Sequence, residues 1–204
     1  MKLILASRNL HKIREMRAML KPLHLDIWSL VDFPHYKPPR ELGLTFEENA
    51  IIKGEHAAKT LGAWALADDS GLVVPALGGF PGVTSHRYAG ENATDKENRA
   101  KLLAAMKGME GEARQAYFEC CLALASPEGL ERTAKGVVEG LITEKEKGGN
   151  GFGYDPIFIK REYGKTFAEL VEETKNRISH RRCALDKLFP HLEMLLEKEA
   201  NLKK

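Results

Sequence analysis

The strongest folding signal in the chain is a helix with defined ends between Thr45 and Gly62. Thr45 and Glu48 have the spacing of a capping box, in which each side chain accepts a hydrogen bond from the other residue's backbone N–H. Apolar residues then recur on one helical face until the glycine ends the pattern. We therefore predict a helix over Phe46–Leu61.

Short apolar runs on both sides of this helix predict strands. Residues 2–6 predict the first strand, and a helix ending before Pro22 follows it. Residues 64–67 resemble a buried strand with Asp68 and Asp69 at its C-terminal end. The remaining patterns predict strands or extended runs at 25–30, 72–77, 115–125, 130–138, 138–143 and 157–159, with a hairpin at 126–129, and helices at 94–107, 179–188 and 191–198.

Composition limits the class of protein. The 204 residues are 43% hydrophobic and 29% charged, which suits one large domain or two small lobes with a real core. The formal net charge of +2 argues against a nucleic-acid partner, and no run approaches the roughly 20 apolar residues of a membrane span. Three cysteines cannot form a disulfide framework, so we expect a cytoplasmic protein. Because no apolar run is long enough to span a membrane, we expect no membrane partner. Lys203 and Lys204 are expected to form a frayed tail.

The turn after the first strand is a candidate phosphate site. It consists of Ser7, Arg8, Asn9, Leu10, His11 and Lys12. The N–H groups at the start of a helix favour an anion, and Lys12 would add a full charge. The turn lacks the glycine spacing of a P-loop, so the alternative is that Asn9 is only an N-cap and Lys12 a solvated lysine.

The adjacent carboxylates Asp68 and Asp69 are the second candidate site. Two carboxylates side by side repel unless a cation intervenes, and hard oxygen ligands suit Mg²⁺ that also contacts substrate phosphates. A carboxylate left free could accept a proton from an attacking water. Glu41, in a proline-rich loop, is a further candidate ligand. The alternatives are an aspartate-rich turn and an ordinary exposed glutamate.

Lys53 lies on or beside the apolar face of the predicted helix. A lysine in that position either extends along the core edge to solvent or points into a cleft, where a phosphate would satisfy it. The sequence leaves both possibilities open.

Two segments near the C-terminus are candidates for recognition of a flat ligand. Phe152, Gly153, Tyr154 and Asp155 belong to a glycine-rich run whose aromatic side chains could stack on a nucleobase; the alternative is a hairpin with its aromatics in the core. His180 and Arg181 follow Ser179 at a predicted helix start, where cations oppose the helix dipole unless an anion or base edge is near. Lys175 is a further candidate donor.

Cys120 and Cys121 have no metal-ligand spacing, and we interpret both as packing residues.

Taken in order, six motifs resemble the inosine triphosphate pyrophosphatase or Ham1-like family of noncanonical purine nucleoside triphosphate pyrophosphatases. These are SRNLHK, TFEENAIIK, ADDSGL, LGGFPGVTSHRYAG, GGNGFGYDPIF and ISHR, and the match runs from residue 3 to about residue 188. The resemblance implies an α/β fold over residues 1–204, a single domain whose long mixed sheet is flanked by helices, with two lobes around a central cleft and a homodimeric state. It also implies Mg²⁺-dependent hydrolysis of ITP, dITP and XTP to monophosphate and pyrophosphate, which cleanses the nucleotide pool.

Carried over by position, the resemblance assigns roles to the candidates. Residues 7–12 would hold the triphosphate together with Lys53, while Glu41, Asp69 and Asp68 would attend the metal. Asp69 would accept the proton, with Lys12 and Lys53 as the other catalytic groups. The contacts to the rest of the substrate would come from Ser70, Phe152, Gly153, Tyr154, Asp155, Lys175, His180 and Arg181.

Three other functions remain open at this stage. A nucleotide-binding sensor would bind a triphosphate without releasing pyrophosphate. A nucleic-acid-binding protein would need a basic stripe, which the scattered lysines do not provide. A pyrophosphatase of modified pyrimidine nucleotides would differ in the base that it selects.

Overall fold

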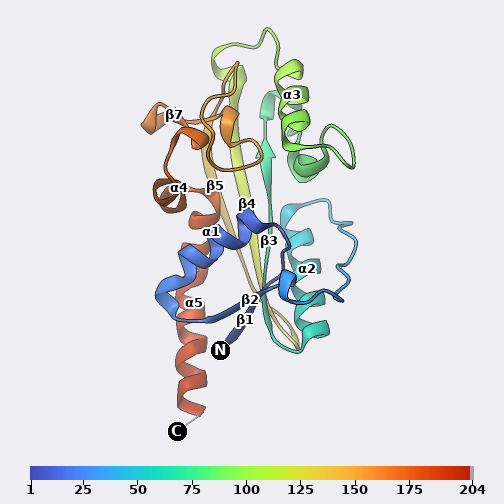
Figure 1. Cartoon of the computed structure of the whole chain (residues 1–204), viewed down its shortest axis with the longest axis vertical. Helices are drawn as coiled ribbons and strands as arrows, with labels where there is room; N and C mark the ends of the chain where they lie inside the picture. The colour runs from blue at the N-terminus through green and yellow to red at the C-terminus, as the bar shows by residue number, and fades with distance from the viewer. Residues whose placement is uncertain (203–204) are drawn as a thin grey trace. The chain divides into compact units, whose positions relative to one another are not determined.

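The computed structural model describes residues 1–202 and contains one seven-stranded sheet, in the order β2-β1-β3-β4-β5-β6-β7 (Figure 1). The predicted tail residues Lys203 and Lys204 lie outside the described residues. The strands are β1 Lys2–Leu5, β2 Asp26–Ser29, β3 Trp64–Val73, β4 Gln115–Ser126, β5 Gly129–Ile142, β6 Phe158–Lys160 and β7 Lys165–Thr166. Because β1 pairs in parallel with β2 and β3, while β6 pairs antiparallel with β5 and β7, the sheet is mixed as predicted.

The helices are α1 Leu10–Leu20, α2 Phe46–Leu61, α3 Asp95–Ala105, α4 Glu172–Ile178 and α5 His180–Leu202. The prediction for α2 is confirmed at both ends. Thr45 and Glu48 form both bonds of the capping box, and Gly62 adopts the left-handed conformation that ends the helix. The predicted hairpin is also present, since only two residues separate β4 from β5.

The chain divides into two compact units. Unit 1 consists of residues 1–69 and 120–136 and of the chain from Arg181 onward; unit 2 consists of residues 70–119 and 137–180. Strands β3, β4 and β5 each contribute residues to both units.

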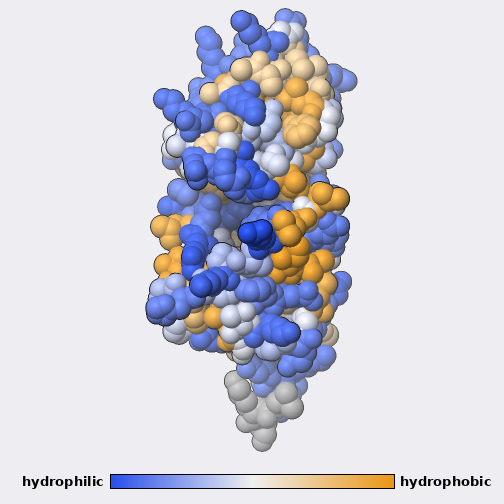
Figure 2. Space-filling view, turned by 90° about the vertical axis from the view of Figure 1, so that its right-hand side faces the viewer, coloured by the Kyte–Doolittle hydropathy of each residue, from blue (hydrophilic) through white to orange (hydrophobic). Residues whose placement is uncertain are grey.

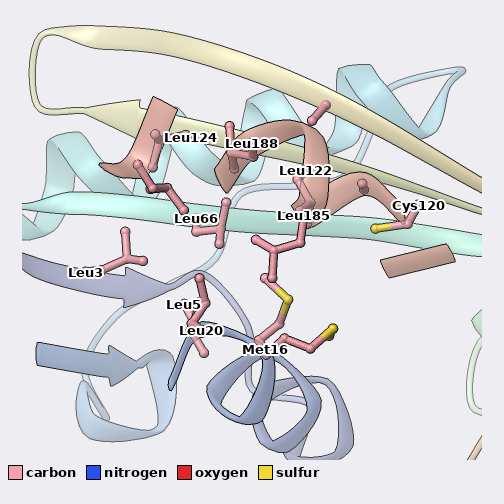
Figure 3. Close-up of a cluster of buried hydrophobic side chains, with 14 of the residues drawn as sticks. Leu3, Leu5, Met16, Leu20, Leu66, Cys120, Leu122, Leu124, Leu185 and Leu188 are labelled. Atoms are coloured by element: carbon pink, nitrogen blue, oxygen red, sulfur yellow. The ribbon is translucent and has the colours of Figure 1, made fainter. Parts of the chain in front are cut away.

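Unit 1 has a core on each face of its strands. Helices α1 and α5 cover one face and α2 covers the other (Figure 1). The α1/α5 side is drawn in Figure 3, where leucine and methionine side chains from both helices meet leucines of β1, β3 and β4. Leu66 faces this core, whereas its neighbours Ala65 and Ala67 face the α2 side. Consecutive side chains of a strand point to opposite faces of the sheet, which explains this alternation.

Unit 2 packs around three aromatic rings. The Phe118 ring lies 4.6 Å from that of Phe158 and is stacked at 5.9 Å on that of Phe167. All three side chains are buried. They come from β4, β6 and the segment after β7, so this cluster joins distant parts of the sequence.

Four predictions about elements were wrong. Strand β3 does not end before Asp68 but continues to Val73, because each aspartate has a cationic partner and can lie within a buried strand. The two predicted C-terminal helices are one helix that contains Pro190, since the apolar stripe Leu185–Leu188–Leu192 packs as a unit on the core. The short helix α4 was missed, and residues 75–77 of the extended run predicted at 72–77 form a 3-10 helix.

The surface is mostly hydrophilic on the face drawn in Figure 2, with apolar side chains in separate groups. The most exposed large apolar side chains include Leu42 and Leu44, which precede α2. Among residues 1–202, no helix is both long enough and apolar enough to cross a membrane.

Candidate active site

The turn at residues 7–12 joins β1 to α1 in unit 1. Asn9 is the N-cap of α1, and its Oδ1 accepts hydrogen bonds from the backbone N–H groups of His11 at 3.0 Å and Lys12 at 3.1 Å. The Ser7 hydroxyl in turn accepts from the Asn9 backbone N–H. Leu10 and His11 are exposed. The capping interpretation of Asn9 is therefore correct, whereas Lys12 is not a solvated lysine, because its ammonium pairs with Asp68.

Asp68 is the centre of a buried charge network on the α1/α5 side. Its carboxylate accepts hydrogen bonds from Lys12 and from the Arg181 Nε at 2.7 Å, and Arg181 also pairs with Glu15. The Cys120 thiol donates to the same carboxylate at 3.2 Å. Burial opposes ionisation of Asp68, but the charges of Arg181 and Lys12 outweigh it and hold the pKa of this carboxyl well below its usual range. Asp68 is thus an ionised anchor for two cations.

Asp69 points to the opposite face, because consecutive side chains of a strand alternate. Its Oδ1 accepts a hydrogen bond from the Lys53 Nζ of α2 at 2.6 Å, and the same ammonium donates to the Asp68 backbone carbonyl at 2.9 Å. Burial raises the pKa of Asp69 more than the neighbouring lysines lower it. A carboxylate with a raised pKa is a better proton acceptor than an ordinary aspartate.

Glu41 approaches the same lysine. Its Oε1 lies 3.7 Å from the Lys53 Nζ, so the carboxylates of Asp69 and Glu41 converge on one positive charge. Burial disfavours the charged form of Lys53, but these carboxylates overcome it and raise the pKa of the ammonium. Lys53 therefore does not simply extend to solvent; it joins two acidic side chains from separate segments.

The carboxylates can be tested for their fit to a divalent cation. Within residues 1–202, no group of three or more histidine, cysteine, aspartate or glutamate side chains is placed to hold a metal. Mg²⁺ is usually held by one or two carboxylates plus substrate phosphates and water, so the pair Asp69 and Glu41 fits this requirement. Asp68 does not, since Arg181 and Lys12 engage its oxygens.

Unit 2 contains the glycine-rich candidate segment. The Asp155 Oδ2 accepts hydrogen bonds from the Phe152 backbone N–H at 2.9 Å and from the Lys175 ammonium. That ammonium also lies 4.6 Å from the centre of the Phe152 ring, a cation–π distance. The Phe152 ring is half-buried, whereas Asp155 and Lys175 are buried. The three residues thus form one interacting group.

The other unit 2 candidates have different environments. Tyr154 is buried and donates its hydroxyl hydrogen to the Ser85 carbonyl at 2.8 Å, which favours the packing interpretation for this ring. Gly153 is held through its backbone, with its N–H donating to Asp95 and its carbonyl accepting from Arg99. The His180 ring stacks on Phe118 at 4.7 Å. Ser70 is half-buried in β3.

Arg181 differs from the prediction that groups it with Lys175 and His180. Those two residues belong to unit 2, whereas the Arg181 guanidinium is in unit 1, fully buried between Asp68 and Glu15. The physical reason is that helix α5 turns consecutive side chains by about 100°, so neighbours in the sequence meet different surroundings.

Sequence reasoning missed two members of the Asp68 network. Glu15 is buried on α1 with Ile13 and Met16 beside it, and its position next to the apolar face was the available signal. Cys120 was interpreted as a packing residue only, but its buried thiol donates to Asp68, and burial raises the pKa of that thiol well above its usual value. Nothing in the local sequence indicates that contact.

Comparisons with known proteins identify the family. Residues 3–191 match the model of the Ham1 family, and the chain belongs to that family. It is 56% identical to the dITP/XTP pyrophosphatase of Protochlamydia amoebophila, over 96% of this chain and 99% of that protein, and 54% identical to the dITP/XTP pyrophosphatase of Chlamydia caviae, over 98% of each. A solved HAM1 protein structure from Coxiella burnetii superposes with a TM-score of 0.85 at 44% identity, covering 97% of this chain and 99% of that chain. The predicted family and fold class are therefore confirmed.

Proposed function

We propose that this protein hydrolyses noncanonical purine nucleoside triphosphates, namely dITP, XTP and ITP, to the monophosphate and pyrophosphate. The names of its relatives support the reaction class, since they are called dITP/XTP pyrophosphatases at 54–56% identity. The observation that carries the proposal for this chain is the pairing of Asp69 with Lys53, beside Glu41. It supplies a proton acceptor and a positive charge at one place.

In the proposed reaction, a water oxygen forms a bond to the α-phosphorus while the bond from that phosphorus to the pyrophosphate oxygen breaks. Asp69 accepts the proton of the water, for which its raised pKa is favourable. Lys12 and Lys53 stabilise the negative charge that develops on the departing pyrophosphate. Phosphoryl transfer depends mainly on such positioning and charge, and less on covalent steps by the protein.

A divalent cation completes this proposal. We assign Mg²⁺ to the carboxylates of Asp69 and Glu41, while Asp68 holds Lys12 and Arg181 in place. When bound, Mg²⁺ would neutralise phosphate charge and act as a Lewis acid. Removal of divalent cations with a chelator should therefore abolish turnover, and addition of Mg²⁺ should restore it.

We assign recognition of the base to Phe152, Lys175 and His180. Phe152 offers a half-buried ring for stacking, and the buried Lys175 and His180 offer donors for a 6-oxo group. Adenine carries an amino group at that position and would leave buried donors unpaired, at a cost of about 1–3 kcal/mol each. This difference favours hypoxanthine and xanthine over adenine, whereas rejection of guanine, which shares the 6-oxo group, needs a second contact near its 2-position. The contacts of Ser70 and Arg181 with substrate stay predictions.

The biological consequence would be cleansing of the nucleotide pool, because removal of deaminated purine triphosphates keeps them out of DNA and RNA. We place this activity in the cytoplasm, in keeping with the low cysteine count and a nucleotide substrate. We also propose a homodimer, which light scattering would reveal as twice the mass of one chain.

The test is a panel of nucleotides with pyrophosphate and orthophosphate measured separately. With Mg²⁺ present, dITP, XTP and ITP should release pyrophosphate rapidly, while ATP, GTP and dTTP should not. Orthophosphate as the first product would contradict attack at the α-phosphorus. Binding without any release would favour a nucleotide sensor, and a preference for dTTP would favour a pyrimidine nucleotide pyrophosphatase.

A further inference from the structure

Arg8 lies in the 7–12 turn, but its guanidinium contacts a distant segment of unit 1. Its Nη2 donates to the backbone carbonyl of Tyr36 at 2.6 Å, across 28 positions of the sequence. Tyr36 belongs to residues 33–45, which connect the first part of unit 1 to α2 and carry Glu41. We call these residues the Glu41 loop. Arg8 is thus a direct link between the 7–12 turn and the Glu41 loop.

The loop is fixed at its Tyr36 end by two further contacts. The Tyr36 hydroxyl shares a hydrogen bond with the His56 Nδ1 of α2 at 2.8 Å, and the two rings meet edge to face at 5.4 Å. The Tyr36 side chain is buried. Burial raises the pKa of Tyr36, so its hydroxyl stays protonated and available for the bond near neutral pH.

A separate set of contacts fixes the other end of the loop. The buried Asn49 side chain accepts from the Gly43 N–H at 2.8 Å and donates to the Gly43 carbonyl at 3.4 Å. Glu48 accepts from the Leu44 N–H at 2.7 Å. A Cβ at residue 43 would lie 2.7 Å from the Asn49 Oδ1 and from the Glu48 Cβ, which explains why a glycine occupies this position.

Glu41 therefore lies on a short span between two anchors. Residues 37–42 form neither helix nor strand, and Pro38 and Pro39 restrict their backbone. The Glu41 carboxylate is only 3.7 Å from the Lys53 Nζ, a distance that depends on where the two anchors hold the span. One of the anchors comes from the 7–12 turn, through Arg8.

We propose that Arg8 is a positioning residue for Glu41: by holding the Tyr36 carbonyl, it sets the affinity of the Asp69–Glu41 pair for a divalent cation. This inference rests on the proposed function, and it gives Arg8 a role other than the phosphate contact predicted from the sequence. Residues around metal ligands commonly change metal affinity by about 10-fold to 100-fold when they are lost. Because Arg8 acts through one hydrogen bond to the loop, we expect a change near the lower value.

The test measures cation binding and loop protection in the absence of nucleotide, so that catalysis does not enter. Mn²⁺ serves as the probe, with free Mn²⁺ followed by electron paramagnetic resonance. Arg8→Ala should weaken Mn²⁺ binding about 10-fold, and hydrogen exchange of the Tyr36 amide, which is bonded to the Phe33 carbonyl, should become faster. The exposed Arg132→Ala on β5 is the matched control and should change neither quantity.

Two further variants separate positioning from direct binding. In a Glu41→Gln background, Arg8→Ala should cause no additional loss of Mn²⁺ affinity, because the positioned group is gone. Tyr36→Phe removes the bond to His56 but keeps the ring, and it should weaken Mn²⁺ binding in the same direction; it also serves if Arg8→Ala does not fold. Binding of XTP in chelator should stay unchanged in Arg8→Ala.

Different results would overturn the role of Arg8 and the proposed function. Unchanged Mn²⁺ affinity and unchanged exchange in Arg8→Ala would overturn the positioning role, and so would a loss confined to XTP binding, which would assign Arg8 to the phosphates. If the wild-type protein neither bound Mn²⁺ nor released pyrophosphate, the proposed function itself would fail, and this inference with it.

Discussion

At the residue scale, the main finding is that adjacent aspartates perform different tasks. Asp68 and Asp69 lie in the middle of one strand, and alternation of side chains directs them to opposite faces. Each meets its own cations, and the two pKa shifts have opposite directions. These cationic partners offset the repulsion expected between neighbouring carboxylates. The arrangement separates a structural anchor from the proposed proton acceptor.

The first prediction concerns the proton acceptor. Asp69→Asn should lower kcat for dITP by about a hundredfold to ten-thousandfold, because the amide cannot take the proton of the attacking water. Nucleotide affinity, measured by calorimetry in chelator, should be retained. Turnover within a factor of two of the wild type would contradict the role of Asp69.

The second prediction concerns the anchor. Asp68→Asn leaves Arg181 buried with one carboxylate fewer, and loss of one partner of a buried ion pair typically costs about 3–5 kcal/mol. Urea unfolding at neutral pH should show this loss. The matched control is Asp186→Asn, which breaks the half-exposed pair with Arg182 and should cost at most about 1 kcal/mol. Equal losses in the two variants would contradict a stabilising role for the buried Asp68–Arg181 pair.

The pH dependence of stability follows from the same carboxyl group. The pKa of Asp68 is lower in the folded protein than in the unfolded chain, where it is about 4. Its contribution to the free energy of unfolding is therefore present above that value and lost as the pH falls through the folded pKa. The gap in stability between wild type and Asp68→Asn should narrow as the pH drops below about 4. A gap that stays constant down to the acid limit would disagree with the lowered pKa.

At the element scale, the glycine-rich turn before Asp155 shows how a backbone conformation positions a side chain. Gly151 has a φ of +74°, and a Cβ there would lie 2.0 Å from the Asp155 Oδ2. That oxygen is the one that binds the Phe152 N–H and the Lys175 ammonium. Only glycine combines this φ with this close approach.

A pair of variants two residues apart tests this point. Gly151→Ala should displace Asp155, lower the free energy of unfolding by about 1–3 kcal/mol and raise KM for dITP. Gly149→Ala is the control, since a Cβ at residue 149 meets no atom within 4 Å. For each variant, urea unfolding measures the free energy of unfolding and steady-state kinetics measure KM for dITP. Identical behaviour of the two variants would show that the turn does not position Asp155.

At the scale of the whole molecule, local signals predicted elements well and long-range contacts poorly. The capping box of Thr45 and Glu48 defined α2 completely, because a cap is a contact between near neighbours. Lys12, Cys120 and Arg181 lie 56, 52 and 113 positions from Asp68, and no pattern along the chain indicates that they meet. The identities of most candidates were available from family motifs; their partners required the fold.

The same limit explains the errors. Strand β3 was predicted to end at Ala67 because charged residues are rare inside buried strands, and the cations that satisfy Asp68 and Asp69 come from α1, α2 and α5. Helix α5 was divided at Pro190 because proline disfavours a helix interior, yet its leucine stripe is continuous across the proline. In both cases tertiary contacts outweighed a local preference.

The most direct test of the central claim is hydrolysis of dITP in water enriched in ¹⁸O, with the products separated and analysed by mass spectrometry. Attack of water on the α-phosphorus predicts one ¹⁸O atom in dIMP and none in pyrophosphate. Label in the pyrophosphate, or in orthophosphate released from the γ-position, would contradict the reaction proposed for Asp69, Lys53 and Lys12.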